Sequence, residues 1–186
     1  MEEKMDIITA IKTRRSIRKF KSEPVPKETL LQLMEAVRWA PSWANTQCWE
    51  VIVVEDQAKK EELAEAMPPG NPGKKAVLEA PVVLVFLGQK KKAGYKEGKP
   101  VTEKDDWWYM FDVALAVENF CLYAHGQGLG SLIIGYFDAF KVATSLNIPE
   151  DKAVTVMVPV GFPAEVPKAP KRKEVEEFVH QGLYGK

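Results

Sequence analysis

Positively charged side chains gather in two places that lie far apart in the chain. The first group follows a predicted helix over residues 5–11 and consists of Arg14, Arg15, Ser16 and Arg18. The second group, near the other end, contains Arg172 and Lys173. Guanidinium groups bind phosphate by paired hydrogen bonds, and a hydroxyl among them can donate another. Both groups are also compatible with solvated surface charge, so a phosphate site is one of two interpretations.

A polar loop between a predicted helix and a predicted strand carries a second set of candidate ligand-binding residues. They are Pro41, Ser42, Trp43, Asn45 and Gln47. An isoalloxazine ring needs an apolar face to stack on and hydrogen-bonding groups for its pyrimidine edge. The Trp43 indole could cover such a ring, and the amides and hydroxyl could serve its edge. An ordinary turn is the alternative, and Trp49 is expected in the core.

Sequence motifs for several other chemistries are missing. Residues 128–138 (GLGSLIIGYFD) have GxxxxG spacing but not the Lys-Ser/Thr of a P-loop, and they do not form GxGxxG. His125 and His180 have no partner at metal-binding spacing, so both are interpreted as structural and no metal is expected. No nucleophile elbow is present. Without an obvious acid, base or nucleophile, we expect a bound cofactor to carry the chemistry.

Length and composition indicate one globular domain over residues 1–186. Lys plus Arg and Asp plus Glu number 26 each, so no net charge draws the chain to nucleic acid or to a membrane. Cys48 and Cys121 form no CxxC pair and are interpreted as reduced thiols of a cytoplasmic protein, Cys121 as an inert core thiol. The apolar stretches are strand-sized, too short for a membrane span.

Hydrophobic periodicity predicts helices that alternate with strands. The expected helices cover residues 27–40, 59–67, 106–127 and 139–146, and the expected strands cover 50–54, 82–87, 131–135 and 154–162. This alternation favours a sheet with helices on both faces. The helix over 106–127 is apolar nearly all round, so we expect it inside the domain or at a subunit interface. Residues 88–104 are expected to form a mobile surface loop.

Four sequence segments occur in an order that resembles the nitroreductase family. They are RRSIRKF, APSWANTQCWE, the apolar helix ending in GLGS, and VPVGFP followed by a Lys/Arg-rich ending. The resemblance extends over residues 6–184 and implies an α+β fold with a mixed central sheet flanked by helices. It also implies an obligate homodimer with two FMN sites in the subunit interface.

The resemblance assigns roles to the candidate residues. Arg14, Arg15, Ser16 and Arg18 match the motif that holds the phosphate, ribityl chain and pyrimidine edge. Pro41, Ser42, Trp43 and Asn45, with Gln47 beside them, match the loop that the other subunit contributes. Ile133, Ile134 and Gly135 match the segment along the buried side of the ring, and Arg172 with Lys173 matches a basic pair that reaches the phosphate.

The sequence departs from the family pattern in three respects. Cys48 replaces the proline that family members commonly have, and residues 133–136 lack the glutamate of well-known bacterial nitroreductases. The chain is also short, with little room for large inserted helices. We therefore expect an open pocket, covered at most by residues 88–104.

The implied activity is a ping-pong transfer of electrons from NADH or NADPH to small electron-poor acceptors such as nitroaromatics, quinones and flavins. No side chain is assigned as a general acid, and Arg18 is the candidate for positive charge beside the reduced ring. Three alternatives stay open: a flavin-binding storage or regulatory protein, a specialised flavoprotein such as a reductive dehalogenase, and a basic-edged interaction module without cofactor.

Overall fold

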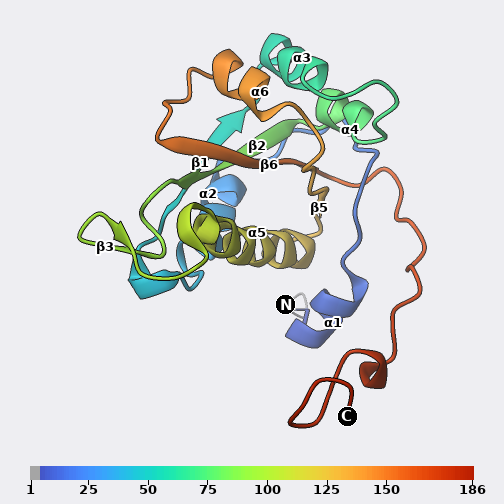
Figure 1. Ribbon diagram of the computed structural model, residues 1–186. Helices are drawn as coiled ribbons and strands as arrows, with labels where there is room; N and C mark the ends of the chain where they lie inside the picture. The colour runs from blue at the N-terminus through green and yellow to red at the C-terminus, as the bar shows by residue number, and fades with distance from the viewer. Residues whose placement is uncertain (1–4) are drawn as a thin grey trace.

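The computed structural model describes residues 5–186, with the side chain of Asp105 left out, and its centre is a four-stranded sheet (Figure 1). The strands are β1 (Trp49–Val54), β2 (Val82–Gln89), β6 (Lys152–Gly161) and β5 (Gly130–Ser131), in this spatial order. The three ladders between them are antiparallel. The parallel character expected of a mixed sheet is limited to an isolated bridge between Ser16 and Ser131. The predicted α+β class is confirmed.

The central strand β2 explains why the sheet is covered on both faces. Seven of its eight residues are buried, as expected for an apolar strand with neighbours on both sides and helices above and below. Because side chains alternate along a strand, Val83 and Val85 face one core, whereas Leu84 and Phe86 face the other. The prediction of helices on both faces is therefore confirmed.

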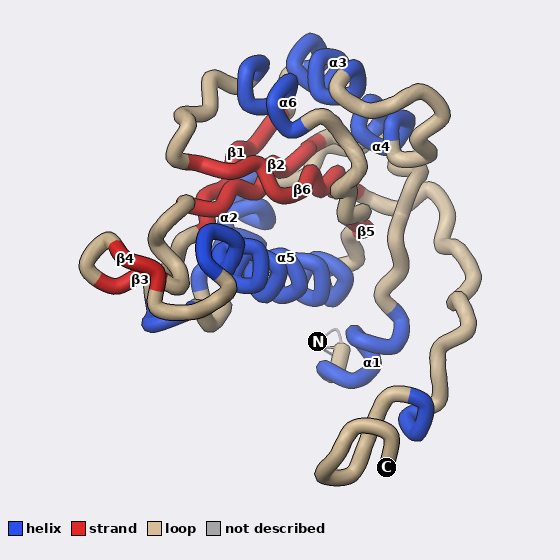
Figure 2. The backbone as a smooth tube through the Cα atoms, viewed as in Figure 1, coloured by secondary structure: helices blue, strands red, loops and turns tan. Residues whose placement is uncertain are grey.

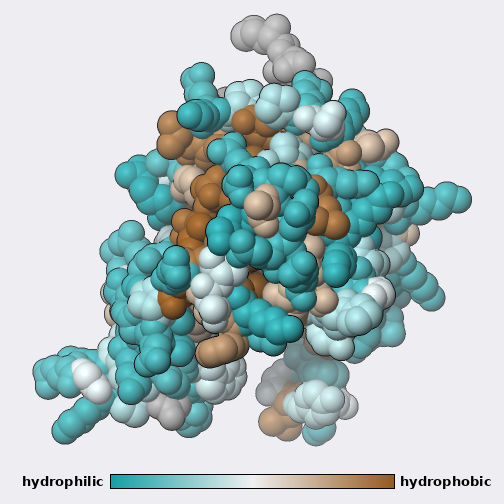
Figure 3. All heavy atoms as spheres, turned by 90° about the horizontal axis from the view of Figure 1, so that it is seen from above, coloured by the Kyte–Doolittle hydropathy of each residue, from teal (hydrophilic) through white to brown (hydrophobic). Residues whose placement is uncertain are grey.

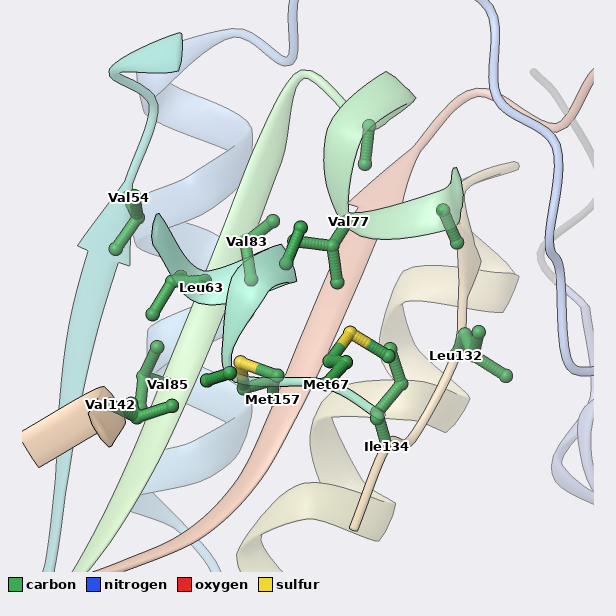
Figure 4. Packing of buried hydrophobic residues seen from close by; sticks show 14 of the residues in the cluster. Val54, Leu63, Met67, Val77, Val83, Val85, Leu132, Ile134, Val142 and Met157 are labelled. Carbon is green, nitrogen blue, oxygen red and sulfur yellow. The ribbon is translucent and has the colours of Figure 1, made fainter. Parts of the chain in front are cut away.

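Three short helices cover the first face of the sheet: α3 (Gln57–Glu65), α4 (Lys74–Glu79) and α6 (Ala139–Ser145) (Figure 1). Figure 4 shows Leu63 of α3, Val77 of α4 and Val142 of α6 pointing toward the strand residues. Asp56 begins α3 by accepting a hydrogen bond from the Lys59 N–H at 2.9 Å. Seen from above, the outer surface of this layer is mostly hydrophilic, with smaller hydrophobic areas (Figure 3).

The second face is covered by α2 (Lys27–Arg38) and the long helix α5 (Trp108–Gly126). The rings of Phe86 and Phe120 pack edge to face with 6.0 Å between centroids. α5 buries one side here but leaves Met110 and Phe111 exposed, so within one protomer it is not buried all round. Trp49 was expected in the core. It is only partly buried against the edge of this cluster, because it begins the edge strand β1.

Helix α1 (Ile7–Thr13), helix α4 and the segment over residues 88–104 differ from what the sequence predicted. Local capping and turn geometry account for the differences in α1 and in residues 88–104. Asp6 accepts from the Thr9 N–H at 3.1 Å, so α1 begins and ends later than predicted. α4 was missed. Residues 88–104 contain a small hairpin, β3 (Tyr95–Lys96) and β4 (Lys99–Pro100), whose turn residues Glu97 and Gly98 both have positive φ.

Short 3₁₀ turns complete the described elements: η1 (Trp43–Asn45), η2 (Asp105–Trp107) and η3 (Val175–Glu177). The last of them lies in residues 164–186, which are exposed throughout and are called the tail below. Figures 1 and 2 show this segment running past α1 and ending away from the sheet. In the described part of the chain, no helix is both long enough and apolar enough to span a membrane.

Candidate active site

The parallel bridge at the sheet edge brings two predicted site segments together. The Ile17 N–H donates to the Ser131 carbonyl at 2.9 Å, which places residues 14–18 beside residues 129–135. Gly130 makes this close approach possible, because a Cβ there would lie 2.5 Å from Ile17 Cγ1. Sequence order alone could not show this pairing.

Three guanidinium groups lie along this edge without a carboxylate partner. Arg15 donates to the carbonyls of Lys12 and Arg14 at 2.7 Å each, and Arg18 donates to the Ser16 carbonyl at 3.4 Å. Within the described residues, no ion pair involves any of the three arginines. Arg14 and Arg15, both half-buried, line a hollow of about 190 Å³. An unpaired, partly desolvated cationic cluster of this kind favours a bound anion.

His125 connects this cluster to α5. Its Nε2 lies 2.8 Å from Thr13 Oγ1, and that hydroxyl donates its own proton to the Thr9 carbonyl at 2.6 Å. His125 Nε2 is therefore assigned as the donor. Partial burial lowers the pKa of His125, and the charges of Arg14 and Arg15 lower it further. The structural role predicted for His125 agrees with this contact.

Acidification is expected to destabilise the protein through His125. Because its folded-state pKa lies below the ordinary 6.5, the unfolded chain takes up the proton first as pH falls. The free energy of unfolding should therefore decrease between pH 6.5 and the folded-state pKa. Urea unfolding at a series of pH values should show a flatter profile for His125→Gln. His180→Gln, in the exposed tail, is the control, and equal profiles for all three proteins would contradict the assignment.

The polar loop lies at the opposite end of α5. The Trp43 N–H donates to both carboxylate oxygens of Asp112, at 3.2 and 3.1 Å, and Ser42 Oγ accepts from the Gln47 N–H at 2.9 Å. Trp43 is half-buried, whereas Asn45 and Gln47 are exposed. With a rise of about 1.5 Å per residue, Asp112 and His125 are roughly 20 Å apart along the helix. One protomer therefore does not bring the loop and the arginine cluster together.

The remaining predicted residues divide into exposed and buried positions. Ile133 and Gly135 are exposed, but the side chain of Ile134 points into the core (Figure 4). The Ile134 N–H and carbonyl are also both paired with Met157, at 2.9 and 3.0 Å. A ligand can therefore contact the residues on either side of Ile134, but not its side chain.

Arg172 and Lys173 are exposed on the tail and far from the other site residues in sequence. Before them, the tail is held to the body by the Lys19–Glu165 ion pair at 2.8 Å and by the Ala164 N–H, which donates to the Lys19 carbonyl. Among residues 5–186, no hydrogen bond or ion pair joins this second basic group to the first.

Cys121 and Asp112 complete the account of the buried polar groups on α5. Cys121 is buried and its pKa is raised to about 11 by that burial, which agrees with an inert core thiol. Asp112 was missed by sequence reasoning. The sequence feature that could have revealed Asp112 is an acidic residue between Phe111 and Val113 in a predicted apolar helix.

Comparison with known proteins decides the family. The pattern of the nitroreductase family matches residues 11–162. The chain belongs to this family. The family predicted from the order of the four sequence segments is thereby confirmed.

Relatives of similar length support the assignment. An NADH dehydrogenase of Thermus thermophilus is 32% identical over 200 residues, with 94% of this chain and 95% of the relative covered. An FMN-dependent nitroreductase of Clostridium difficile R20291 superposes with a TM-score of 0.78 at 28% identity, with 95% and 99% of the chains covered. The NADPH:FMN oxidoreductase of Vibrio harveyi, solved with NAD⁺, gives 0.81 at 27% identity, with 97% and 78% covered.

Proposed function

We propose that this protein is an FMN-dependent oxidoreductase that passes electrons from NADH or NADPH to small electron-poor acceptors and acts as a homodimer. The observation that carries the proposal is the unpaired cluster of Arg14, Arg15 and Arg18 beside its hollow. Relatives whose names include FMN and NAD(P)H identify the class of anion that such a cluster would hold.

The residues at the sheet edge fit a flavin mononucleotide. Arg14, Arg15 and Ser16 supply charge and a hydroxyl for the phosphate. Arg18, the most exposed of the three clustered arginines, supplies charge for the polar edge of the ring. An FMN held by these residues would supply the two-electron redox chemistry between a nicotinamide and an acceptor. The protein binds and orients the reactants, and solvent delivers protons to an open site.

A second copy of the chain would complete the site. An apolar groove of about 490 Å³ runs between α1, α2 and α5, lined by residues that include Ile7, Trp39 and Tyr123. Ile7 is 78% exposed and Trp39 is 73% exposed, an unusual amount of large apolar surface for a free protomer. If two copies of α5 lie antiparallel here, the loop of one protomer approaches the arginine cluster of the other.

The tail supports the same arrangement. Its apolar residues Val175, Phe178 and Leu183 are 59–64% exposed and lie on a segment that leaves its own protomer. Packing on a second copy would bury them and could carry Arg172 and Lys173 to a phosphate. Nitroaromatics, quinones and flavins are the proposed acceptors, because flat molecules can stack in an open site in turn.

Spectroscopy of the purified protein tests the proposal directly. The protein should carry a flavin absorption band, NADH or NADPH should bleach it rapidly, and a quinone or nitroarene should restore it. A flavin band that the nicotinamides do not bleach would instead indicate a storage or regulatory protein. A colourless protein that does not bind added FMN would eliminate the proposal.

Substitution of two tryptophans distinguishes a role in ligand binding, proposed for Trp43, from a role in packing, proposed for Trp49. Trp43→Ala should change KM for the acceptor or the fluorescence of the flavin with little change in Tm, because its indole is proposed to lie beside the ring. Trp49→Ala should lower the free energy of unfolding by about 3 kcal/mol, the low end for a large aromatic, because Trp49 is only partly buried. Thermal melts and steady-state kinetics measure both. A large drop in Tm for Trp43→Ala with normal kinetics would place Trp43 in the core.

A further inference from the structure

Asp112 is a buried carboxylate in an apolar helix. It is 1% exposed, and within the described residues it forms no ion pair. An unpaired buried carboxylate is unfavourable unless several donors surround it. The residues on either side of Asp112 in α5, Phe111 and Val113, are apolar, so they offer the carboxylate neither a hydrogen bond nor an opposite charge. The presence of a carboxylate here requires another explanation.

All the donors around this carboxylate come from the polar loop or from the start of α5. The Trp43 N–H contacts both oxygens, and Cys48 Sγ lies 3.6 Å from Oδ2. The Thr46 hydroxyl and the Trp108 indole N–H also lower the pKa of Asp112, although neither buried atom meets hydrogen-bond geometry with any partner among the described residues. Burial raises the pKa of Asp112, and these four donors oppose that effect.

The loop held by Asp112 has a strained backbone. Ala44, Asn45 and Gln47 have φ of 46°, 55° and 47°, in the left-handed region that non-glycine residues rarely adopt. Such a conformation persists only where surrounding contacts determine it, and it is often found where a ligand is bound. Hydrogen bonds within the loop, such as Gln47 N–H to Ser42 Oγ and Thr46 N–H to the Trp43 carbonyl, shape the segment, and the contacts to Asp112 fix it to the helix.

We infer that Asp112 is a positioning residue, whose carboxylate holds the strained loop in the shape that presents Trp43 and Asn45 to the flavin of the partner protomer. This inference rests on the proposed function. Asp112 does not touch the flavin itself, because it is buried behind the loop. Cys48 contributes a thiol donor to the same carboxylate. It therefore acts on how the loop is anchored rather than on what the loop offers the ring.

Because the charge of Asp112 lowers stability, removing the charge distinguishes an effect on the position of the loop from an effect on the stability of the fold. A folded-state pKa raised above its unfolded value means that folding favours the protonated acid, so the ionised form lowers stability above that pKa. Asparagine removes this unfavourable charge and keeps one acceptor oxygen, but its NH₂ faces the donors of the loop. Asp112→Asn should therefore keep the fold while loosening the loop.

The experiment compares Asp112→Asn with Asp56→Asn in the full-length protein. Asp56 also accepts a backbone N–H, at 2.9 Å, but it caps α3 on the other face of the sheet. We expect Asp112→Asn to weaken FMN binding about ten-fold, because the loop loses one charge-assisted hydrogen bond that holds it in the binding shape. Its Tm and its dimer should be unchanged. Asp56→Asn should bind FMN as the wild type does.

A second pair of variants tests the anchor without changing Asp112. Cys48→Ser keeps a donor to the carboxylate and should retain wild-type FMN affinity, whereas Cys48→Val removes it and should weaken binding about three-fold. These variants decide the matter even if Asp112→Asn does not fold. Equal FMN affinity for Cys48→Ser and Cys48→Val in that case would overturn the inference.

The outcomes distinguish this inference from the proposed function. A wild-type protein that binds no FMN overturns both. A wild-type protein that binds FMN, together with an Asp112→Asn variant of unchanged affinity and unchanged KM for the acceptor, overturns the positioning role alone. Loss of FMN in proportion to a loss of Tm and of the dimer would assign Asp112 to the structural core and would also overturn it.

Discussion

Replacing Arg14 with alanine is expected to lower the affinity for FMN roughly ten- to a hundred-fold. A charge-assisted contact to phosphate contributes about 1.5–3 kcal/mol, and among the described residues Arg14 has no carboxylate that could compete for it. Titration of the apoprotein with FMN, followed by flavin fluorescence, measures the change. Thermal stability without FMN should hardly change.

Arg172→Ala tests whether the tail reaches the same phosphate. We expect a loss of affinity of the same order, since the tail is proposed to carry this charge to the site. Lys141→Ala, an exposed residue on α6, controls for the change in net charge and should bind FMN normally. Unchanged affinity in both arginine variants would remove the phosphate assignment. A loss with Arg14→Ala alone would remove only the role of the tail.

Placing charge in the apolar groove is expected to dissociate the dimer and abolish FMN binding together. Ile7→Glu combined with Trp39→Glu puts two carboxylates where an obligate interface of more than about 2,000 Å² would exclude water. Both residues are largely exposed in the protomer, so its fold should survive. Sedimentation at micromolar concentration, together with flavin absorbance, measures the two effects.

The control for the groove is Phe140→Glu, because Phe140 is 81% exposed on α6, away from the groove. It should leave the dimer and the flavin in place. A wild-type monomer that is well folded and binds FMN at sub-micromolar concentration would contradict the shared site.

The elements with strong periodic patterns could be predicted from the sequence. β2 is an apolar run as far as Gly88, and β6 is apolar after Lys152 except for Thr155. α2 and α5 repeat apolar residues over three turns or more, so the positions of all four elements follow from the pattern. α4 is only six residues long, too short for periodicity to reveal. Trp49 was misplaced because residue type predicts burial, but not whether a strand lies at the edge of a sheet.

The candidate site could be predicted as segments but not as an arrangement. Residue chemistry and motif order identify the arginine cluster and the polar loop. The pairing of Ile17 with Ser131, and the separation of the two groups along α5, depend on contacts between residues far apart in sequence. Ile134 belongs to the segment predicted along the ring, and the sequence did not show that its side chain would lie in the core beside Met157.

The length of α5 has a further consequence for how this fold can vary. Its 19 residues extend about 28 Å, and in the proposed dimer each end serves a different flavin. The length of the helix thus fixes the distance between the two flavin sites of the proposed dimer. One inserted residue would move one end by about 1.5 Å and rotate it by about 100° relative to the other, which would misalign both centres at once. Insertions should therefore accumulate in the β3–β4 hairpin, where added length leaves this spacing unchanged.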